Sequence, residues 1–284
     1  MNLKNVNIIP SNQDIKRKII VPNKLNKELA ELIGILTGDG SIGFYKGEGY
    51  THYQIRFYGH KTEDFDYYNK NVNGLFKNLF NVDLKIRSHK SQGNTSFITI
   101  DSKVIFQFLS KTLQIPTGKK FLFLKIPKYI KKSNSKIKKA FLRGLADTDA
   151  SLTFKKKHKD KNYYPVISLK QKNKRIIEEV VEILDEFGFS LYVQYDIITK
   201  DKRGFESNGN CIYLNGKKNL ERWIKLIGFN NLKHKTKYLI WKKIGYCNSN
   251  TTLEQRKIIL SRRARRDSNS RGSLFEETFP RPIA

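Results

Sequence analysis

The stretch Leu32-Ile33-Gly34-Ile35-Leu36-Thr37-Gly38-Asp39-Gly40 decides the fold, because it recurs 110 residues later as Leu142-Arg143-Gly144-Leu145-Ala146-Asp147-Thr148-Asp149-Ala150. Each copy reads as the C-terminal part of an apolar helix. Both copies carry small residues at positions i, i+4 and i+8, namely Ala30, Gly34 and Gly38 in the first and Ala140, Gly144 and Thr148 in the second. A glycine inside a helix costs about 1 kcal/mol relative to alanine. We therefore expect these two ridges of small residues to pack closely against each other.

The acidic residues Asp39 and Asp149 occupy the same place in each copy. If the ridges face each other around a pseudo-twofold axis, the two carboxylates meet at adjoining helix ends. They would repel each other there, and the helix dipole disfavours negative charge at a C-terminus. A bound divalent cation would remove this conflict. The alternative is that both aspartates are ordinary turn residues at the ends of buried helices. The presence of two copies at matched spacing disfavours this alternative.

The charge of the chain predicts a polyanionic partner. Lys and Arg number 55 against 26 acidic residues, and the net charge of +29 is spread along the whole sequence. The sequence contains no long apolar run or signal peptide, so we expect no membrane partner. Cys211 and Cys247 form no metal-ligand pattern or disulfide framework, which favours a reducing, intracellular setting such as cytoplasm, nucleoid or organelle.

The order of the expected elements repeats as well. Each half reads helix, strand, strand, helix, strand, strand, helix, which predicts an α+β fold of two pseudo-symmetric αββαββα halves. Strands are expected at 41–44, 51–58, 82–88 and 96–100, and in the second half at 151–154, 189–196 and 210–214. We divide the chain into a basic N-terminal arm (1–24), a first half (25–115), a linker (116–137), a second half (138–246) and a basic, flexible tail (247–284).

These residues and their spacing resemble the LAGLIDADG homing endonucleases of the single-chain, two-motif kind, over residues 25–246. The resemblance implies that the motif helices form the domain interface and that two antiparallel sheets form a saddle over DNA. It also implies cleavage of both strands of a long asymmetric site by a monomer that uses Mg²⁺, or another divalent cation such as Mn²⁺. Two positions depart from the family pattern: Thr37 replaces the acidic residue seen at Asp147, and Ala150 replaces the closing glycine matched by Gly40.

The resemblance also implies roles for individual residues. Asp39 and Asp149 would bind the metal, with the carbonyls of Gly38 and Thr148 as further ligands. A lysine with a neighbouring polar residue just after the second strand would order the attacking water. By position these are Lys61 with His60 and Lys172 with Gln171, and Lys170 competes for the second-half role. Asp147 is expected to be structural.

DNA would be read by the polar faces of the strands, on which polar side chains alternate with apolar ones. Arginine favours guanine and glutamine favours adenine in the major groove. The candidate DNA-binding residues are Gln54, Arg56, Tyr58, Lys85, Arg87, Tyr192, Gln194 and Lys170.

Other functions stay open at this point. A noncutting binder, such as a maturase that grips intron RNA, would need the same basic sheets but not both acids, and both acids are present. An intein is disfavoured, because residue 1 is Met and the chain ends without a His-Asn pair. A membrane-surface role is disfavoured because the charge follows alternating strands and not one amphipathic helix.

Overall fold

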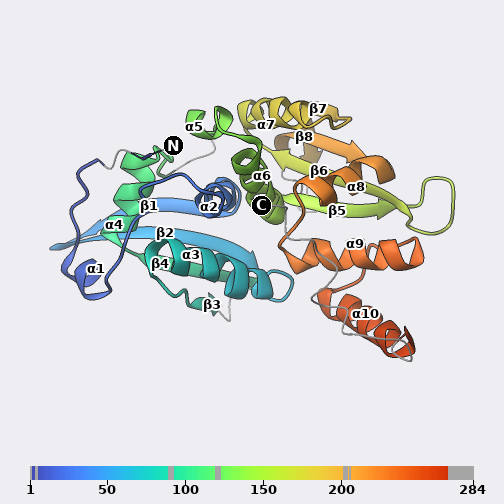
Figure 1. Ribbon diagram of the computed structural model, residues 1–284, viewed down its shortest axis with the longest axis horizontal. Coiled ribbons are helices and arrows are strands. Elements are labelled where there is room, and N and C mark those ends of the chain that lie inside the picture. Colours follow the sequence, from blue (N-terminus) through green and yellow to red (C-terminus); the bar gives the residue numbers. More distant parts are fainter. Residues whose placement is uncertain are drawn as a thin grey trace.

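Two helices pack against each other at the centre of the molecule: α2 (Lys27–Thr37) and α6 (Ser135–Asp149) (Figure 1). The computed structural model describes residues 2–3, 6–88, 93–118, 123–200, 204 and 206–267. Each central helix begins at an asparagine cap: the Asn26 side chain accepts the Leu29 N–H at 2.8 Å, and the Asn134 side chain accepts that of Ile137 at 3.2 Å.

The ridge of small residues lies in the contact between these helices, as predicted. A Cβ atom on Gly34 would lie 2.1 Å from the carbonyl oxygen of Phe141, and one on Gly144 would lie 2.1 Å from that of Glu31. Real Cβ atoms never approach backbone so closely, so both positions require glycine. The missing side chains let the two backbones touch, and this contact joins the halves.

The first half forms an antiparallel sheet of order β1-β2-β4-β3. Its strands are β1 (Gly40–Gly47), β2 (Tyr50–His60), β3 (Ile86–Ser88) and β4 (Thr95–Asp101). The helical segments η1 (Tyr67–Val72) and α3 (Asn73–Phe80) pack on its apolar face, where the Phe57 and Phe76 rings lie 5.7 Å apart. The segments α4 (Lys103–Gln107) and η3 (Phe108–Thr112) close this half.

One expected strand is shorter than predicted. The range 82–88 pairs with the sheet only from Ile86 onward. The reason is local: the Leu84 N–H donates to the side-chain oxygen of Asn73 in α3 at 2.7 Å, so this part of the backbone bonds to a helix and not to a strand.

The second half repeats the arrangement with the sheet order β5-β6-β8-β7. Its strands are β5 (Ala150–Lys155), β6 (Tyr164–Gln171), β7 (Tyr192–Lys200) and β8 (Glu206–Asn215), and its helices are α7 (Lys174–Glu186) and α8 (Gly216–Leu226). The predicted α+β class and the two-half layout are confirmed. Strand β7 begins later than expected and contains a register shift between Gln194 and Ile197.

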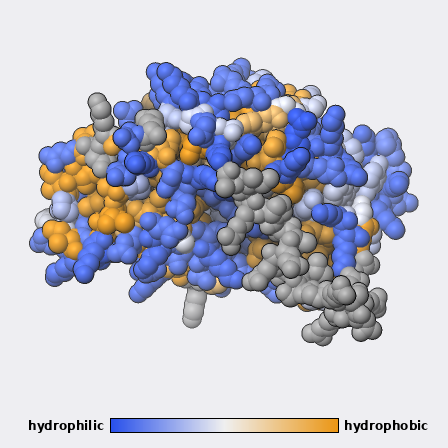
Figure 2. All heavy atoms as spheres, viewed as in Figure 1, coloured by the Kyte–Doolittle hydropathy of each residue, from blue (hydrophilic) through white to orange (hydrophobic). Residues whose placement is uncertain are grey.

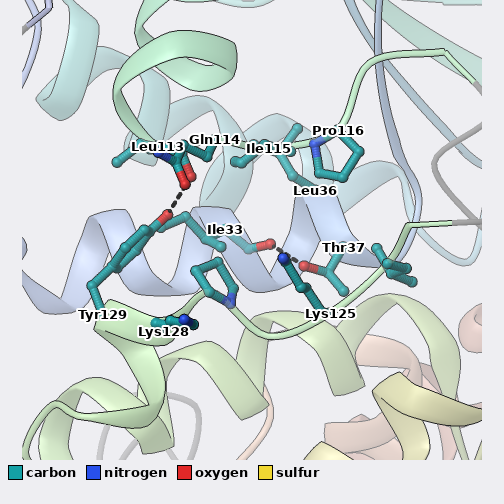
Figure 3. A pocket seen from close by; sticks show the side chains of 12 residues that line it. Ile33, Leu36, Thr37, Leu113, Gln114, Ile115, Pro116, Lys125, Lys128 and Tyr129 are labelled. Atoms are coloured by element: carbon teal, nitrogen blue, oxygen red, sulfur yellow. Dashed lines mark hydrogen bonds between the residues drawn. The ribbon is translucent and has the colours of Figure 1, made fainter.

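The linker between the halves is packed along α2. It contains α5 (Lys128–Lys131), and α6 begins at Ser135, inside the range assigned to the linker. Figure 3 shows residues of the linker around a pocket beside Ile33 and Leu36 of α2. The Tyr129 hydroxyl closes one side by donating to the Leu113 carbonyl at 3.0 Å.

The N-terminal arm contains α1 (Asn12–Lys16), whose Asp14 carboxylate accepts the Val104 N–H at 3.2 Å at the start of α4. This bond ties the arm to the first half. Within the described ranges, every helix is too short or too polar to cross a lipid bilayer.

The expectation of a flexible tail over 247–284 is wrong for its first part. After α9 (Leu232–Ile244), the chain forms α10 (Leu253–Asp267), which lies beside α9 (Figure 1). The Arg256 side chain is 1% exposed, and its guanidinium binds Glu63 of the first half at 2.5 Å and the Thr236 hydroxyl at 2.9 Å. A basic residue that reads as surface is here a buried anchor between the halves. Residues 268–284 lie outside the described part of the chain.

Candidate active site and nucleic-acid interface

Asp39 and Asp149 lie at the touching C-terminal ends of the two motif helices. A Cβ atom on Gly38 would lie 2.1 Å from the hydroxyl oxygen of Thr148 and 3.1 Å from the carboxyl carbon of Asp149. Both aspartates are partly exposed. The two halves therefore bring the acids to one accessible place, where the first strand of each sheet begins.

The first acid is contacted by a tyrosine that the sequence pattern did not single out. The Tyr68 hydroxyl lies 3.0 Å from Oδ2 of Asp39 and 2.9 Å from the carbonyl oxygen of Tyr58. Burial, followed by the negative charge of Asp39, raises the pKa of Tyr68 well above its ordinary value, so the phenol stays a donor. The only sequence signal was a tyrosine within the apolar stripe of a helix.

The second acid is contacted by a predicted residue. The side-chain amide of Gln171, the last residue of β6, donates to Oδ2 of Asp149. The structure thus brings Gln171 to the acid of its own half, while its role in catalysis stays a prediction.

The predicted basic residues lie at the ends of β2 and β6 or in the turns that follow, with different partners. The His60 ring nitrogen Nδ1 accepts the backbone N–H groups of Thr62 and Glu63, each at 3.3 Å, at the turn after β2. Lys61 and Lys172 have exposed side chains on the corresponding turns. The Lys170 ammonium donates to the Thr199 hydroxyl at 3.0 Å across the sheet, so Lys170 belongs to the open face and not to Asp149.

The register of the strands corrects the predicted pairing of the two lysines. Gly40 pairs with Phe57, and Ala150 pairs with Leu169. Counting on from these equivalent positions, Gln171 corresponds to Gly59, and Lys172 corresponds to His60 and not to Lys61. The misalignment arose because the Lys-Gln-Lys run can be aligned in more than one way by sequence.

A further lysine reaches the site from α9. The Lys233 ammonium lies 3.0 Å from Oδ1 of Asp64 and 3.4 Å from the carbonyl oxygen of Thr148, a predicted metal ligand. Asp64 in turn accepts the His60 N–H at 2.9 Å. No signal marked Lys233, because it lies in a lysine-rich segment far from either motif.

Asp147 has the structural role expected of it. Its side chain is fully buried, and its carboxylate accepts the N–H groups of Asn230 and Asn231, at 2.9 and 3.0 Å respectively. Burial raises the pKa of Asp147 to about 7, while these two backbone hydrogen bonds oppose the rise. It anchors the loop before α9 and does not belong to the metal-binding set.

The donor set suits a hard cation that keeps most of its water. The described residues contain no cluster of three or more His, Cys, Asp and Glu side chains able to hold a metal. Mg²⁺ is usually held by one or two carboxylates together with water and substrate phosphate oxygens. Two carboxylates and the Gly38 carbonyl fit that pattern. The Thr148 carbonyl, the other predicted ligand, accepts a hydrogen bond from Lys233 at 3.4 Å.

The predicted DNA-binding side chains lie on the sheet faces opposite the core. Tyr58, Phe97 and Arg87 form one row across β2, β4 and β3. Lys170, Cys211 and Gln194 form a matching row across β6, β8 and β7.

Some of these side chains also contact one another. The Arg56 guanidinium lies 4.9 Å from the centre of the Tyr45 ring and donates to Gln54. The Tyr192 hydroxyl accepts from the Gln194 amide at 3.1 Å. Lys85 is exposed but precedes β3. In the one view that Figure 2 gives, the surface is largely hydrophilic.

Comparison with known proteins identifies the duplicated motif. The family model described as "LAGLIDADG-like domain" matches residues 136–228, which include all of α6 except its first residue and both strand pairs of the second sheet. The second half of the chain is therefore similar to a LAGLIDADG-like domain. The first half supplies the other motif helix, with the same strand order.

One solved structure, of I-SmaMI, has a similar fold. A mutant of I-SmaMI covers 87% of this chain and 100% of its own, with 14% identity and a TM-score of 0.50. The homing endonuclease I-DmoI, in complex with DNA and Ca, covers 71% of this chain and 88% of its own, with 20% identity and a TM-score of 0.48. Other I-DmoI structures contain Mn or Mg.

Two curated proteins match part of this chain. The replication factor C small subunit of Methanocaldococcus jannaschii is 31% identical over 118 residues, which are 40% of this chain and 6% of that protein. One component of the A-type ATP synthase of Pyrococcus abyssi is 29% identical over 133 residues, which are 45% of this chain and 11% of that protein. The matches thus span only a small part of these relatives. None of these relatives is described as binding intron RNA, so binding of RNA stays a prediction.

Proposed function

We propose that this LAGLIDADG protein is a site-specific DNA endonuclease that hydrolyses a phosphodiester bond in each strand of a long, asymmetric target. The observation that carries the proposal is the meeting of Asp39 and Asp149 at the ends of packed helices, where both sheets begin. A protein that only gripped nucleic acid would need the sheets but would gain nothing from two adjacent carboxylates, which repel each other.

The sheets bind the duplex, and the motif helices place the chemistry. Rows of polar, basic and aromatic side chains on the open faces suit contacts to base edges and phosphates. Because the two faces carry different side chains, the target need not be palindromic. The net charge of +29 supplies the sequence-independent attraction.

Asp39 and the Gly38 carbonyl would hold Mg²⁺ or Mn²⁺ in the first half, and Asp149 would hold such an ion in the second half. When bound, such an ion stabilises charge on phosphate oxygens and lowers the pKa of a water molecule. The Tyr68 hydroxyl and the Gln171 amide contact the two carboxylates. The Lys233 ammonium, next to the Thr148 carbonyl, is placed to neutralise phosphate charge. Lys61 and Lys172 are exposed in the turns after β2 and β6 and would add positive charge.

The proposal is tested with DNA that lacks the insertion. A plasmid carries the sequences that flank this gene in its genome, joined directly to each other, and is incubated with the protein in Mg²⁺ or in EDTA. We expect linear plasmid in Mg²⁺ only, and no linear product from the same plasmid with the gene in place. Specific binding without linearisation in Mg²⁺ or Mn²⁺ would contradict the proposal and favour a noncutting binder.

A further inference from the structure

The two motif aspartates receive different hydrogen-bond donors. A phenol contacts Asp39, and a primary amide contacts Asp149. The strand register places Gly59 where the second half has Gln171, so this position of the first half carries no side-chain amide. Two otherwise equivalent acids are therefore held by different chemistry.

Gly59 and Tyr68 are complementary in shape. A Cβ atom on Gly59 would lie 2.3 Å from Cε2 of Tyr68, so the ring occupies the space that a side chain would need. Tyr68 is 2% exposed, and its ring packs against Phe57 with centroids 6.4 Å apart. The ring is fixed on both sides, and the position of its hydroxyl follows from this packing.

The hydroxyl lies between two acceptors. It is 3.0 Å from Oδ2 of Asp39 and 2.9 Å from the backbone carbonyl oxygen of Tyr58. A hydroxyl donates one proton, so Asp39 and the Tyr58 carbonyl compete for it. Tyr58 belongs to β2 and faces the predicted DNA surface, where it is 42% exposed. One buried phenol thus connects the carboxylate with the strand that meets the duplex.

We propose that Tyr68 is a positioning residue that orients the Asp39 carboxylate, as Gln171 orients that of Asp149, so that the two half-sites are chemically unequal. This inference rests on the proposed endonuclease function. Removing the Tyr68 hydroxyl slows cleavage of one DNA strand, whereas removing the Gln171 amide slows cleavage of the other.

The test uses Tyr68→Phe, which deletes only the hydroxyl oxygen, and Tyr67→Phe as its matched control. Tyr67 is the neighbouring buried tyrosine, and its hydroxyl has no hydrogen-bond partner among the described residues. Each variant cleaves a target duplex labelled separately on its two strands, in a single turnover at saturating protein. Calorimetric titration of Ca²⁺ into the protein–DNA complex gives a second readout that needs no cleavage.

Loss of a residue that orients a metal ligand typically costs 10–100-fold in metal affinity or activity. We expect Tyr68→Phe to slow one strand by about 10-fold or more and to weaken Ca²⁺ binding, with DNA affinity and melting temperature close to those of wild type. Gln171→Leu slows the other strand, and Tyr67→Phe changes neither. Equal slowing of both strands by Tyr68→Phe, or an effect no larger than that of Tyr67→Phe, would overturn the inference. If the wild-type protein cuts neither strand, the proposed endonuclease function is wrong. The role of Tyr68 is then tested by the calorimetric titration alone, and a Ca²⁺ affinity of Tyr68→Phe equal to that of wild type would overturn it.

Discussion

At the scale of single residues, the aspartates of the second motif show how position decides chemistry. Asp147 and Asp149 are two residues apart on the same helix. Asp149 lies partly exposed beside the other motif, whereas Asp147 is fully buried under the loop before α9. The same functional group is therefore a metal-ligand candidate at one position and a structural anchor at the other.

If Asp39 and Asp149 are metal ligands, their substitution should affect DNA cleavage without affecting DNA binding. Asp39→Asn or Asp149→Asn should abolish double-strand cleavage while leaving DNA affinity within a few-fold of wild type, because the carboxylates serve the ion and not the groove. Gel-shift titration in Ca²⁺ and cleavage in Mg²⁺ measure the two effects on the same duplex. Near-normal cutting by either variant would remove that carboxylate from the metal site.

Asp147 predicts a dependence of stability on pH. Its pKa is raised to about 7 in the folded protein, against an ordinary value of 3.8. Between these values the folded state holds a proton that the unfolded chain has lost, so the free energy of unfolding falls as pH rises through this window and levels off above about pH 7. The slope from this group is at most about 1.4 kcal/mol per pH unit.

Urea unfolding from pH 4.5 to 8 measures this slope. In Asp147→Asn it should be flatter than in wild type, because the variant has no proton to lose at this position. Asp83→Asn, which alters an exposed aspartate paired with Lys77, is the control and should keep the wild-type slope. Identical slopes in all three proteins would show that Asp147 does not titrate in this window.

At the scale of elements, the contact between α2 and α6 depends on two glycines. Both lie against the backbone of the partner helix, at positions where even a methyl group does not fit. Gly74 in α3 offers a contrast, because a Cβ atom there would meet nothing within 4 Å. The chain therefore offers a helical glycine packed against another helix, Gly144, and a helical glycine with open space beside it, Gly74, for comparison.

Gly144→Ala should destabilise the protein by roughly 1–3 kcal/mol, because the added carbon forces the helices apart. Gly74→Ala should instead stabilise it by up to about 1 kcal/mol, because alanine is the better helix former and the site is open. The melting temperatures of the two variants, each compared with that of wild type, test whether the two stability changes have opposite signs. Equal shifts of the same sign would show that α2 and α6 do not depend on this close approach.

At the scale of the whole molecule, α9 and α10 connect the second half to the first beyond the helix interface. Arg256 of α10 pairs with Glu63, and Lys233 of α9 pairs with Asp64. Both acids lie in the segment just after His60, beside the candidate active site. The C-terminal helices thus hold the turn that follows β2 in the first half.

Arg256→Met should cost about 3 kcal/mol, because it leaves Glu63 without its buried partner. The adjacent Lys257 also pairs with the first half, through Asp66 at 2.9 Å, but both side chains of that pair are partly exposed. Lys257→Met should therefore cost less than about 1 kcal/mol. Chemical unfolding monitored by circular dichroism compares the two. A larger loss in Lys257→Met than in Arg256→Met would contradict the anchoring role of Arg256.

The sequence by itself determined the features that repeat locally. Hydrophobic periodicity and the matched motifs predicted the order of helices and strands, the glycine contact and the convergence of Asp39 with Asp149. The strand alternation also predicted which side chains share a face, because side chains alternate along a strand. These properties depend on spacing along the chain, and spacing is visible in a sequence.

Only the tertiary structure decided the contacts between segments that are distant in the chain. Tyr68 reads as an ordinary core residue until its hydroxyl is found beside Asp39, and Lys233 and Arg256 read as surface charges until the chain returns to the first half. The alignment of Lys172 with His60 likewise required the strand register. A side chain's role depends on which partner removes it from water, and for these residues folding brings that partner from a remote segment.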